Sequence, residues 1–94
     1  MASNSEKKVE ALFTRLVKKA GELTWKLAPT ETGIPDRIAL LPNGTVWFVE
    51  LKRAKGGRVF PRQALIHRHL KKRRGNVAVL AGEDDVLLWA TKNL

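Results

Sequence analysis

One short turn sequence constrains this chain more than any other feature. Two runs of strand-forming residues, 36–41 and 45–52, are separated by Pro-Asn-Gly at 42–44, and such a break between strands is typical of a β-hairpin. Proline at the first position and glycine at the last favour a three-residue loop, in which a type I turn is followed by a left-handed glycine. In that register Asp36 lies opposite Glu50, whereas a two-residue loop would shift the pairing by one residue.

Apolar spacing and turn residues also define the elements on the N-terminal side of this hairpin. Apolar residues at a spacing of three and four predict a first helix that ends near Gly21, with Ser3 or Ser5 as its cap. Residues 23–27 alternate as a strand does, and a loop rich in Thr, Gly and Pro follows over 29–35. The chain therefore begins as helix, strand and loop before the hairpin.

The second half of the chain predicts a helix, a strand and a last helix. Pro61 fits the first turn of a helix that runs to about Arg74 and is stopped by Gly75. Residues 77–80 form a short buried strand, and a cluster of acidic residues that begins at Glu83 opens the last helix. The predicted order is αβββαβα, which is an α/β fold with a mixed central sheet flanked by helices.

Size and composition limit the chain to one domain. Its 94 residues, of which 44% are hydrophobic, fit a single domain, residues 1–94, with a modest core. The chain has no cysteine, which excludes disulfide frameworks, thiolate zinc sites and cysteine nucleophiles. No apolar run approaches the ~20 residues of a membrane span, and the polar N-terminus does not resemble a signal peptide. We expect a soluble, cytoplasmic protein.

The net charge of +9 is concentrated in one part of the chain. Ten Lys and Arg and no acidic residue lie within 51–82, whereas the other eight basic residues are balanced by nine acidic ones. Because ordinary surfaces mix both signs of charge, this segment predicts a polyanionic partner, above all nucleic acid, in preference to a merely solvated face. Arg37 and Arg53, which follow Asp36 and Lys52, could also contact phosphate, but strand alternation turns them away from the face of Asp36 and Glu50. The candidate phosphate contacts are Lys55, Arg58, Arg62, Arg68 and Lys72.

Two carboxylates meet across the predicted hairpin. Asp36 and Glu50 are directly opposite, and like charges in that position destabilise a sheet unless a cation neutralises them. Lys52 lies two residues beyond Glu50 and therefore on the same face of its strand. Oxygen ligands from Asp36, Glu50 and the Leu51 carbonyl suit Mg²⁺ or Mn²⁺, which keep several waters and bridge to substrate phosphate.

Four short motifs, taken in order, resemble a known nuclease family. An N-terminal helix with a carboxylate is followed by Gly-Ile-Pro-Asp at 33–36, Phe-Val-Glu-Leu-Lys at 48–52, and Gln63 at the opening of a helix. This series is similar to the virus-type replication-repair nuclease (VRR-NUC) domain of the PD-(D/E)xK superfamily, and the resemblance covers nearly the whole chain. It implies a restriction-endonuclease-like core. One departure is Val59-Phe60 before Pro61, where family members commonly have a Ser or Thr that caps the helix.

The resemblance also implies a role for each of these residues. The two carboxylates of the hairpin would bind the metal, and Lys52 would position or deprotonate the attacking water. Gln63 would orient a carboxylate, a water or the substrate backbone. Glu10 would be the carboxylate of the first helix, with Glu6 as the weaker alternative. The predicted catalytic residues are Asp36, Glu50, Lys52, Gln63 and Glu10, and the predicted metal ligands are Asp36, Glu50, Glu10 and the Leu51 carbonyl.

The histidines, the tryptophans and the leucines of the last helix have no catalytic interpretation. His67 and His69 are two apart on a predicted helix and point about 200° apart, which excludes a shared metal site and favours exposure to solvent. The three tryptophans, Trp25, Trp47 and Trp89, are expected to pack in the core. The last helix carries apolar residues that belong either to an interface or to the core, namely Leu87, Leu88, Trp89 and Leu94.

These features predict a Mg²⁺- or Mn²⁺-dependent endonuclease that is selective for DNA structure. The domain resembles stand-alone phage and bacterial members of the family, which are similar to Holliday-junction resolving enzymes. We therefore expect a four-way DNA junction as substrate, a two-fold homodimer, and a place in DNA repair in a bacterial or phage-infected host cell. Neither a membrane partner nor a small-molecule cofactor is expected. The alternative is a non-catalytic basic DNA-binding module with a nuclease-like fold; an RNA-binding or ribosome-associated protein would explain the charge but not the carboxylates.

Overall fold

Four strands form a single mixed sheet in the computed structural model, which describes residues 2–94 and the side chains from residue 6 onward. Across the sheet they lie in the order β1 (Leu23–Lys26), β2 (Arg37–Leu40), β3 (Val46–Lys52) and β4 (Asn76–Ala81). β2 pairs antiparallel with β1 and β3, and β4 pairs parallel with β3. The helices are α1 (Ala2–Lys19), α2 (Pro61–Lys72) and α3 (Glu83–Asn93). The predicted αβββαβα order and mixed sheet are confirmed.

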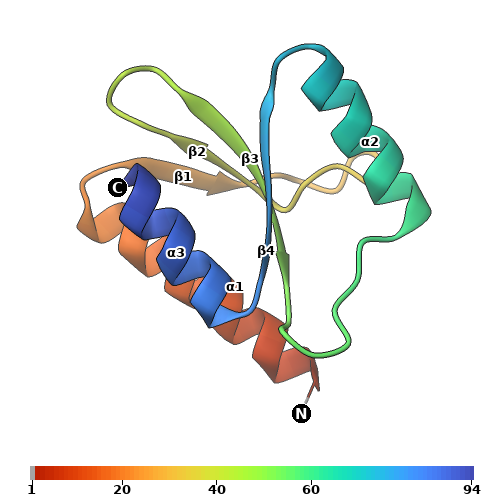
Figure 1. Ribbon diagram of the computed structural model, residues 1–94, viewed down its shortest axis with the longest axis horizontal. Helices are drawn as coiled ribbons and strands as arrows, with labels where there is room; N and C mark the ends of the chain where they lie inside the picture. The colour runs from red at the N-terminus through yellow and green to blue at the C-terminus, as the bar shows by residue number, and fades with distance from the viewer. Residues whose placement is uncertain (1) are drawn as a thin grey trace.

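Helices cover both faces of the sheet (Figure 1). α1 and α3 pack beside each other on one face, where the ring centroids of Phe13 and Trp89 are 5.2 Å apart. Trp47 meets Trp89 edge-on at 5.8 Å, so the core position predicted for these two tryptophans is confirmed. α2 packs against β4 on the other face. The buried core consists of Val9, Leu12, Phe13, Val17, Ala39, Leu41, Val49, Leu51, Leu80, Val86 and Trp89.

The β2–β3 hairpin has the three-residue turn that its sequence predicts. The Leu41 N–H donates to the Thr45 carbonyl at 2.9 Å, and the Gly44 N–H donates to the Leu41 carbonyl at 2.9 Å. Gly44 has a φ of +83°, the left-handed conformation that glycine adopts without steric cost. The resulting register pairs Arg37 with Val49, so one further step along both strands sets the preceding Asp opposite Glu50.

Side chains of β3 alternate between two very different surroundings. Val49 and Leu51 are buried in the core beneath α1 and α3. Glu50 and Lys52 point to the opposite face, where α2 lies, and are also buried. Because β3 is paired on both edges and covered on both faces, its polar residues are held within the structure and not at its surface.

Trp25 is not in the core, and the prediction for this residue was wrong. Its side chain is 57% exposed on β1, which is an edge strand. The adjacent Thr24 takes the inward position, where its hydroxyl donates to the Ile38 carbonyl at 2.8 Å and accepts from Arg37 Nε at 3.2 Å. Since neighbours in a strand point to opposite faces, Trp25 points away from α1, the helix that packs against β1.

α2 ends at Lys72, two residues before the predicted end at Arg74. Arg74 has a left-handed φ of +64°, and the Gly75 N–H donates back to the Leu70 carbonyl at 2.8 Å. A Cβ at position 75 would lie 2.9 Å from that same oxygen. Glycine is therefore needed after the helix because it allows the chain to close over the last turn.

Two further features concern the start of α1 and the burial of residues along α3. α1 begins at Ala2, ahead of Ser3 and Ser5, whose side chains lie outside the described residues together with the predicted cap. In α3, Val86 and Trp89 are buried, whereas Leu87 at 48% and Leu88 at 57% are largely exposed, as is Leu94 at 41% directly after the helix. Within the described residues, each helix is too short or too polar to span a membrane.

Two substitutions test this division between buried and exposed aromatic rings. Phe13→Ala should lower the free energy of unfolding by about 3–5 kcal/mol, because it opens a cavity in the core. Trp25→Ala should change it by less than about 0.5 kcal/mol, because the ring is mostly solvated. Urea denaturation followed by circular dichroism measures both values. Equal losses would contradict the arrangement, and Phe13→Leu provides a milder change if the alanine variant does not fold.

Candidate active site

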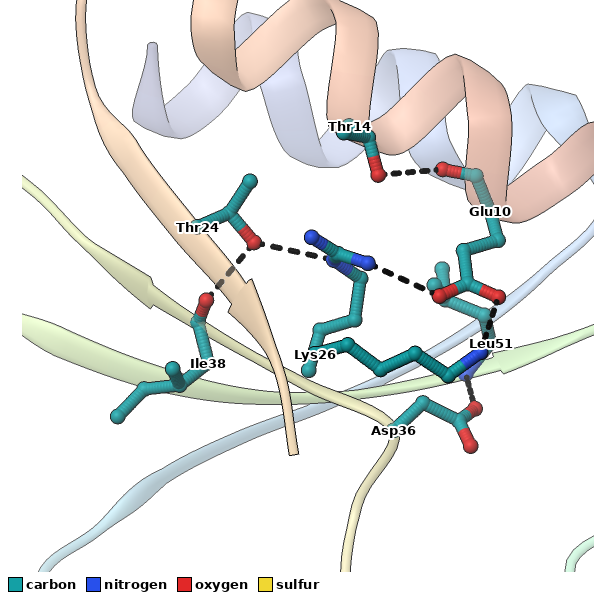
Figure 2. A network of polar contacts seen from close by, with 8 residues as sticks. Glu10, Thr14, Thr24, Lys26, Asp36, Ile38 and Leu51 are labelled. Carbon is teal, nitrogen blue, oxygen red and sulfur yellow. Dashed lines mark hydrogen bonds and ion pairs between the residues drawn. The ribbon is translucent and has the colours of Figure 1, made fainter. Parts of the chain in front are cut away.

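Asp36 is held against β3 by a backbone hydrogen bond. Its Oδ2 accepts the Leu51 N–H at 2.8 Å (Figure 2). The bond follows from the hairpin register, since Asp36 immediately precedes β2 and faces the end of β3. The two carboxylates of the hairpin are brought together, close enough for the charge of Asp36 to raise the pKa of Glu50.

Glu50 is a buried carboxyl group that resists ionisation. Its residue surface is 1% exposed. Burial, and then the adjacent Asp36, raise the pKa of Glu50 from 4.5 to about 8, against the opposing effect of Lys52. A carboxyl group with so strong a perturbation, next to a second carboxylate, is typical of a functional site.

Two side chains of α2, Gln63 and His67, contact the two oxygens of the Glu50 carboxyl. Gln63 Nε2 donates to Glu50 Oε2 at 3.3 Å, and His67 Nε2 lies 3.2 Å from Glu50 Oε1. The Gln63 Oε1 also accepts the Phe60 N–H at 2.9 Å. Gln63 therefore orients the carboxyl and also accepts the N–H of the N-cap residue, which is one of the two bonds of a capping box, while Phe60 has no side-chain oxygen to supply the other.

His67 was wrongly predicted to be exposed. It is 6% exposed and lies one helical turn beyond Gln63, so both side chains face the sheet. Burial, followed by the charges of Lys71 and Lys52, lowers the pKa of His67 below its usual 6.5, so its contact with Glu50 at neutral pH is a hydrogen bond and not an ion pair. The spacing between Gln63 and His67 was the signal that could have revealed this residue.

Lys52 opens onto a hollow at the end of β3. The residue is 7% exposed, and its Nζ lies 5.2 Å from the centroid of the Phe60 ring. The hollow has a volume of about 370 Å³. It is lined by Glu6, Lys52, Arg53, Gly56, Gly57, Arg58 and Phe60. The lysine of the Glu-x-Lys pair thus reaches solvent at a basic, Gly-rich loop.

The two glutamates of α1 have different surroundings. Glu10 is engaged by two cations, since its carboxylate lies 3.0 Å from Arg37 Nη1 and 3.5 Å from Lys26 Nζ (Figure 2). Glu6 lines the hollow, and its charge contributes to the raised pKa of Glu50. This arrangement favours Glu6 over Glu10 as the helical carboxylate that faces Glu50.

The basic residues divide into exposed ones and ones with structural contacts. Arg62 donates to the Thr32 carbonyl at 3.2 Å and lies 3.4 Å from Glu31, so it holds the loop before Asp36 against α2. Arg37 is buried on the α1 face, as strand alternation predicts, and Arg53 donates to carbonyls of its own loop. The other predicted phosphate contacts are exposed on the loop or on α2: Lys55, Arg58, Arg68 and Lys72.

The donor set fits a hard divalent cation. Burial, and then the charge of Asp36, keep the Glu50 carboxyl protonated at neutral pH, and a cation bound beside both groups would favour its ionised form. Among the described side chains, no group of three or more acidic or histidine residues is spaced to enclose a metal. Two carboxylates with a backbone carbonyl suit Mg²⁺ or Mn²⁺, which complete their coordination with water and substrate phosphate.

A mixed sheet with Pro-Asp directly before one strand and Glu-x-Lys at the end of the next is the arrangement of the PD-(D/E)xK class of nucleases. A solved structure described as "VRR_NUC domain" superposes with a TM-score of 0.85 and 30% identity, over 93% of this chain and 95% of that one. A phage protein named "Putative nuclease p44", from Acyrthosiphon pisum secondary endosymbiont phage 1, is 36% identical over 84% of this chain and 85% of its own length. No family model matches the chain. The chain belongs to the VRR-NUC family of nuclease domains.

The raised pKa of Glu50 predicts a pH-dependent stability for the metal-free protein. Between pH 4.5 and about 8 the folded state keeps a proton that the unfolded state releases, so the free energy of unfolding falls as the pH rises through this range. Glu50→Gln should remove that dependence and raise the melting temperature in EDTA at pH 8.5 by about 5 °C or more, with little effect at pH 4.5. Thermal melts across this range measure the effect. If the melting temperatures of the two proteins changed with pH in the same way, the prediction would be contradicted.

The different surroundings of Glu10 and Glu6 predict different costs of neutralisation. Glu10→Gln leaves the buried Arg37 without its counter-charge and should lower the free energy of unfolding by about 1–3 kcal/mol. Glu6→Gln should leave it within about 0.5 kcal/mol of the parent. Chemical denaturation at pH 7 compares the two variants. A larger loss for Glu6→Gln than for Glu10→Gln would contradict these assignments.

Proposed function

We propose that this nuclease domain is a divalent-metal-dependent endonuclease that hydrolyses phosphodiester bonds in DNA. The observation that carries the proposal is the buried Glu50 carboxyl, placed between Asp36 and Lys52. A DNA-binding surface gains nothing from two adjacent carboxylates, because they repel phosphate. Metal-dependent phosphodiester hydrolysis explains both the carboxylates and the basic surroundings.

In this proposal the metal ligands are Asp36, Glu50, the Leu51 carbonyl and a carboxylate of α1. A Mg²⁺ or Mn²⁺ ion held by these residues would lower the pKa of a bound water and would stabilise the charge that develops on the scissile phosphate. Lys52, at the hollow, would position the attacking water or accept a proton from it. Of the α1 glutamates, Glu6 is the better candidate, because Glu10 already pairs with two cations.

Gln63 and His67 are positioning residues in this proposal. Each makes a hydrogen bond to one oxygen of the Glu50 carboxyl, so the group has one orientation in the absence of any ligand. Carboxylates that bind metals are commonly oriented by such partners. The rigid α2 scaffold therefore prepares Glu50 for the cation.

The proposed substrate is branched DNA, with the four-way junction as the first candidate, and the proposed assembly is a homodimer. Symmetric cleavage of two strands requires two active sites, and a chain with one such site obtains the second through a two-fold axis. The exposed leucines in and directly after α3, Leu87, Leu88 and Leu94, offer an apolar surface for that contact. The exposed cations on the loop and on α2 would follow the DNA backbone.

A cleavage assay tests the proposal. Purified protein is incubated with a labelled four-way junction and with the matching linear duplex, in Mg²⁺, Mn²⁺, Ca²⁺ or EDTA. We expect metal-dependent cleavage of the junction, and a loss of at least about 100-fold in rate for Lys52→Ala. Lys92→Ala, the same change at an exposed lysine of α3, is the control and should cleave as the parent does.

The same assay separates a nuclease from a non-catalytic DNA-binding module. Asp36→Asn should abolish cleavage in a nuclease while junction binding is retained. In a binding module it would leave affinity equal or tighter and no metal would produce cleavage in any variant. Full cleavage by Asp36→Asn would remove this residue from the proposed metal site.

A further inference from the structure

Phe60 is an exposed aromatic residue at the mouth of the candidate active site. It is 49% exposed and lines the hollow onto which Lys52 opens. It occupies the N-cap position of α2, where Ser, Thr, Asp and Asn are preferred because their side chains accept backbone N–H groups. The Phe60 ring makes no such bond, although the N–H of Phe60 donates to the Gln63 side chain. Neither helix capping nor core packing explains the ring.

Two cations flank the Phe60 ring. Lys52 Nζ and the Arg58 guanidinium carbon each lie 5.2 Å from its centroid. An aromatic ring among cations in a groove is the arrangement with which proteins bind single-stranded nucleic acid, since bases stack on the ring while the cations contact phosphates. Arg58 is exposed, so its guanidinium can turn to a phosphate and leave the ring face to a base.

We propose that Phe60 is a stacking platform for an unpaired nucleobase beside the scissile phosphate. Its proximity to Lys52 places that base within one nucleotide of the attacked bond. A base in an intact duplex has both faces covered by its neighbours, so the platform selects strands that are unstacked, at a branch point or in a single-stranded segment. This inference rests on the proposed nuclease function and adds to it the feature of DNA that the site recognises.

Fluorescent base substitution tests the platform directly. The probe is 2-aminopurine, placed in turn at each position around the branch point of a four-way junction, in a single strand, and in the matching duplex. Binding is measured in EDTA at one fixed salt concentration, so that no cleavage occurs. We expect the parent protein to change the 2-aminopurine emission at one position of the junction and in the single strand, and to leave the duplex probe unchanged.

Phe60→Ser is the informative variant, because serine removes the ring and supplies an ordinary helix cap. It should bind the junction and the single strand about 5-fold to 150-fold more weakly, with the emission change lost and duplex affinity nearly unaffected. Phe60→Trp should retain both signals. Trp25→Leu removes an exposed ring that lies outside the hollow and should behave as the parent does. If the melting temperature of Phe60→Ser is well below that of the parent protein, Phe60→Leu is used in its place.

The outcomes separate the platform from the nuclease. Cleavage that continues while Phe60→Ser and Phe60→Leu retain full affinity and emission change would overturn the platform and leave the nuclease proposal intact. Equal weakening on junction and duplex would also overturn it, since that pattern indicates a general loss of contact. A parent protein that neither binds nor cleaves any of these DNAs would overturn both proposals.

Discussion

The hydrogen bond from the Leu51 N–H to the Asp36 carboxylate connects the hairpin to the candidate active site. It depends on the three-residue turn, because a slip of one residue would move the β3 side chains to the opposite face. With the observed register, Val49 and Leu51 enter the core while Glu50 and Lys52 point toward α2. One turn therefore decides both how the core packs and where the ionisable groups lie.

Burial of Glu50 beside a second carboxylate opposes folding of the metal-free chain, and α2 is placed to limit that effect. Its Gln63 and His67 contact both oxygens of the carboxyl, so the buried group is not left without partners. The N-cap residue of the same helix, Phe60, lines the hollow. A single helix thus orients the carboxyl group and forms part of the rim at which substrate would enter.

Much of the fold and of the candidate site could be predicted, and the errors have identifiable causes. Strand alternation correctly placed Glu50 and Lys52 on one face, and it correctly turned Arg37 away. Alternation shows which side chains share a face, but not whether a helix covers that face, which is why Trp25 was misplaced. His67 was compared only with its neighbouring histidine, although its spacing from Gln63 placed both on one side of the helix.

The amino-acid sequence by itself determined the order of elements, the hairpin register and the meeting of the two carboxylates. These features depend on turn geometry and on pairing between strands that are close in the chain, so local residue patterns are sufficient. Only the tertiary structure decided that Glu10 pairs with Arg37 while Glu6 faces the hollow, and that His67 is buried and Trp25 exposed. Each of these depends on which surface of a helix or sheet meets an element distant in sequence, and the spacing of residues within one element does not contain that information.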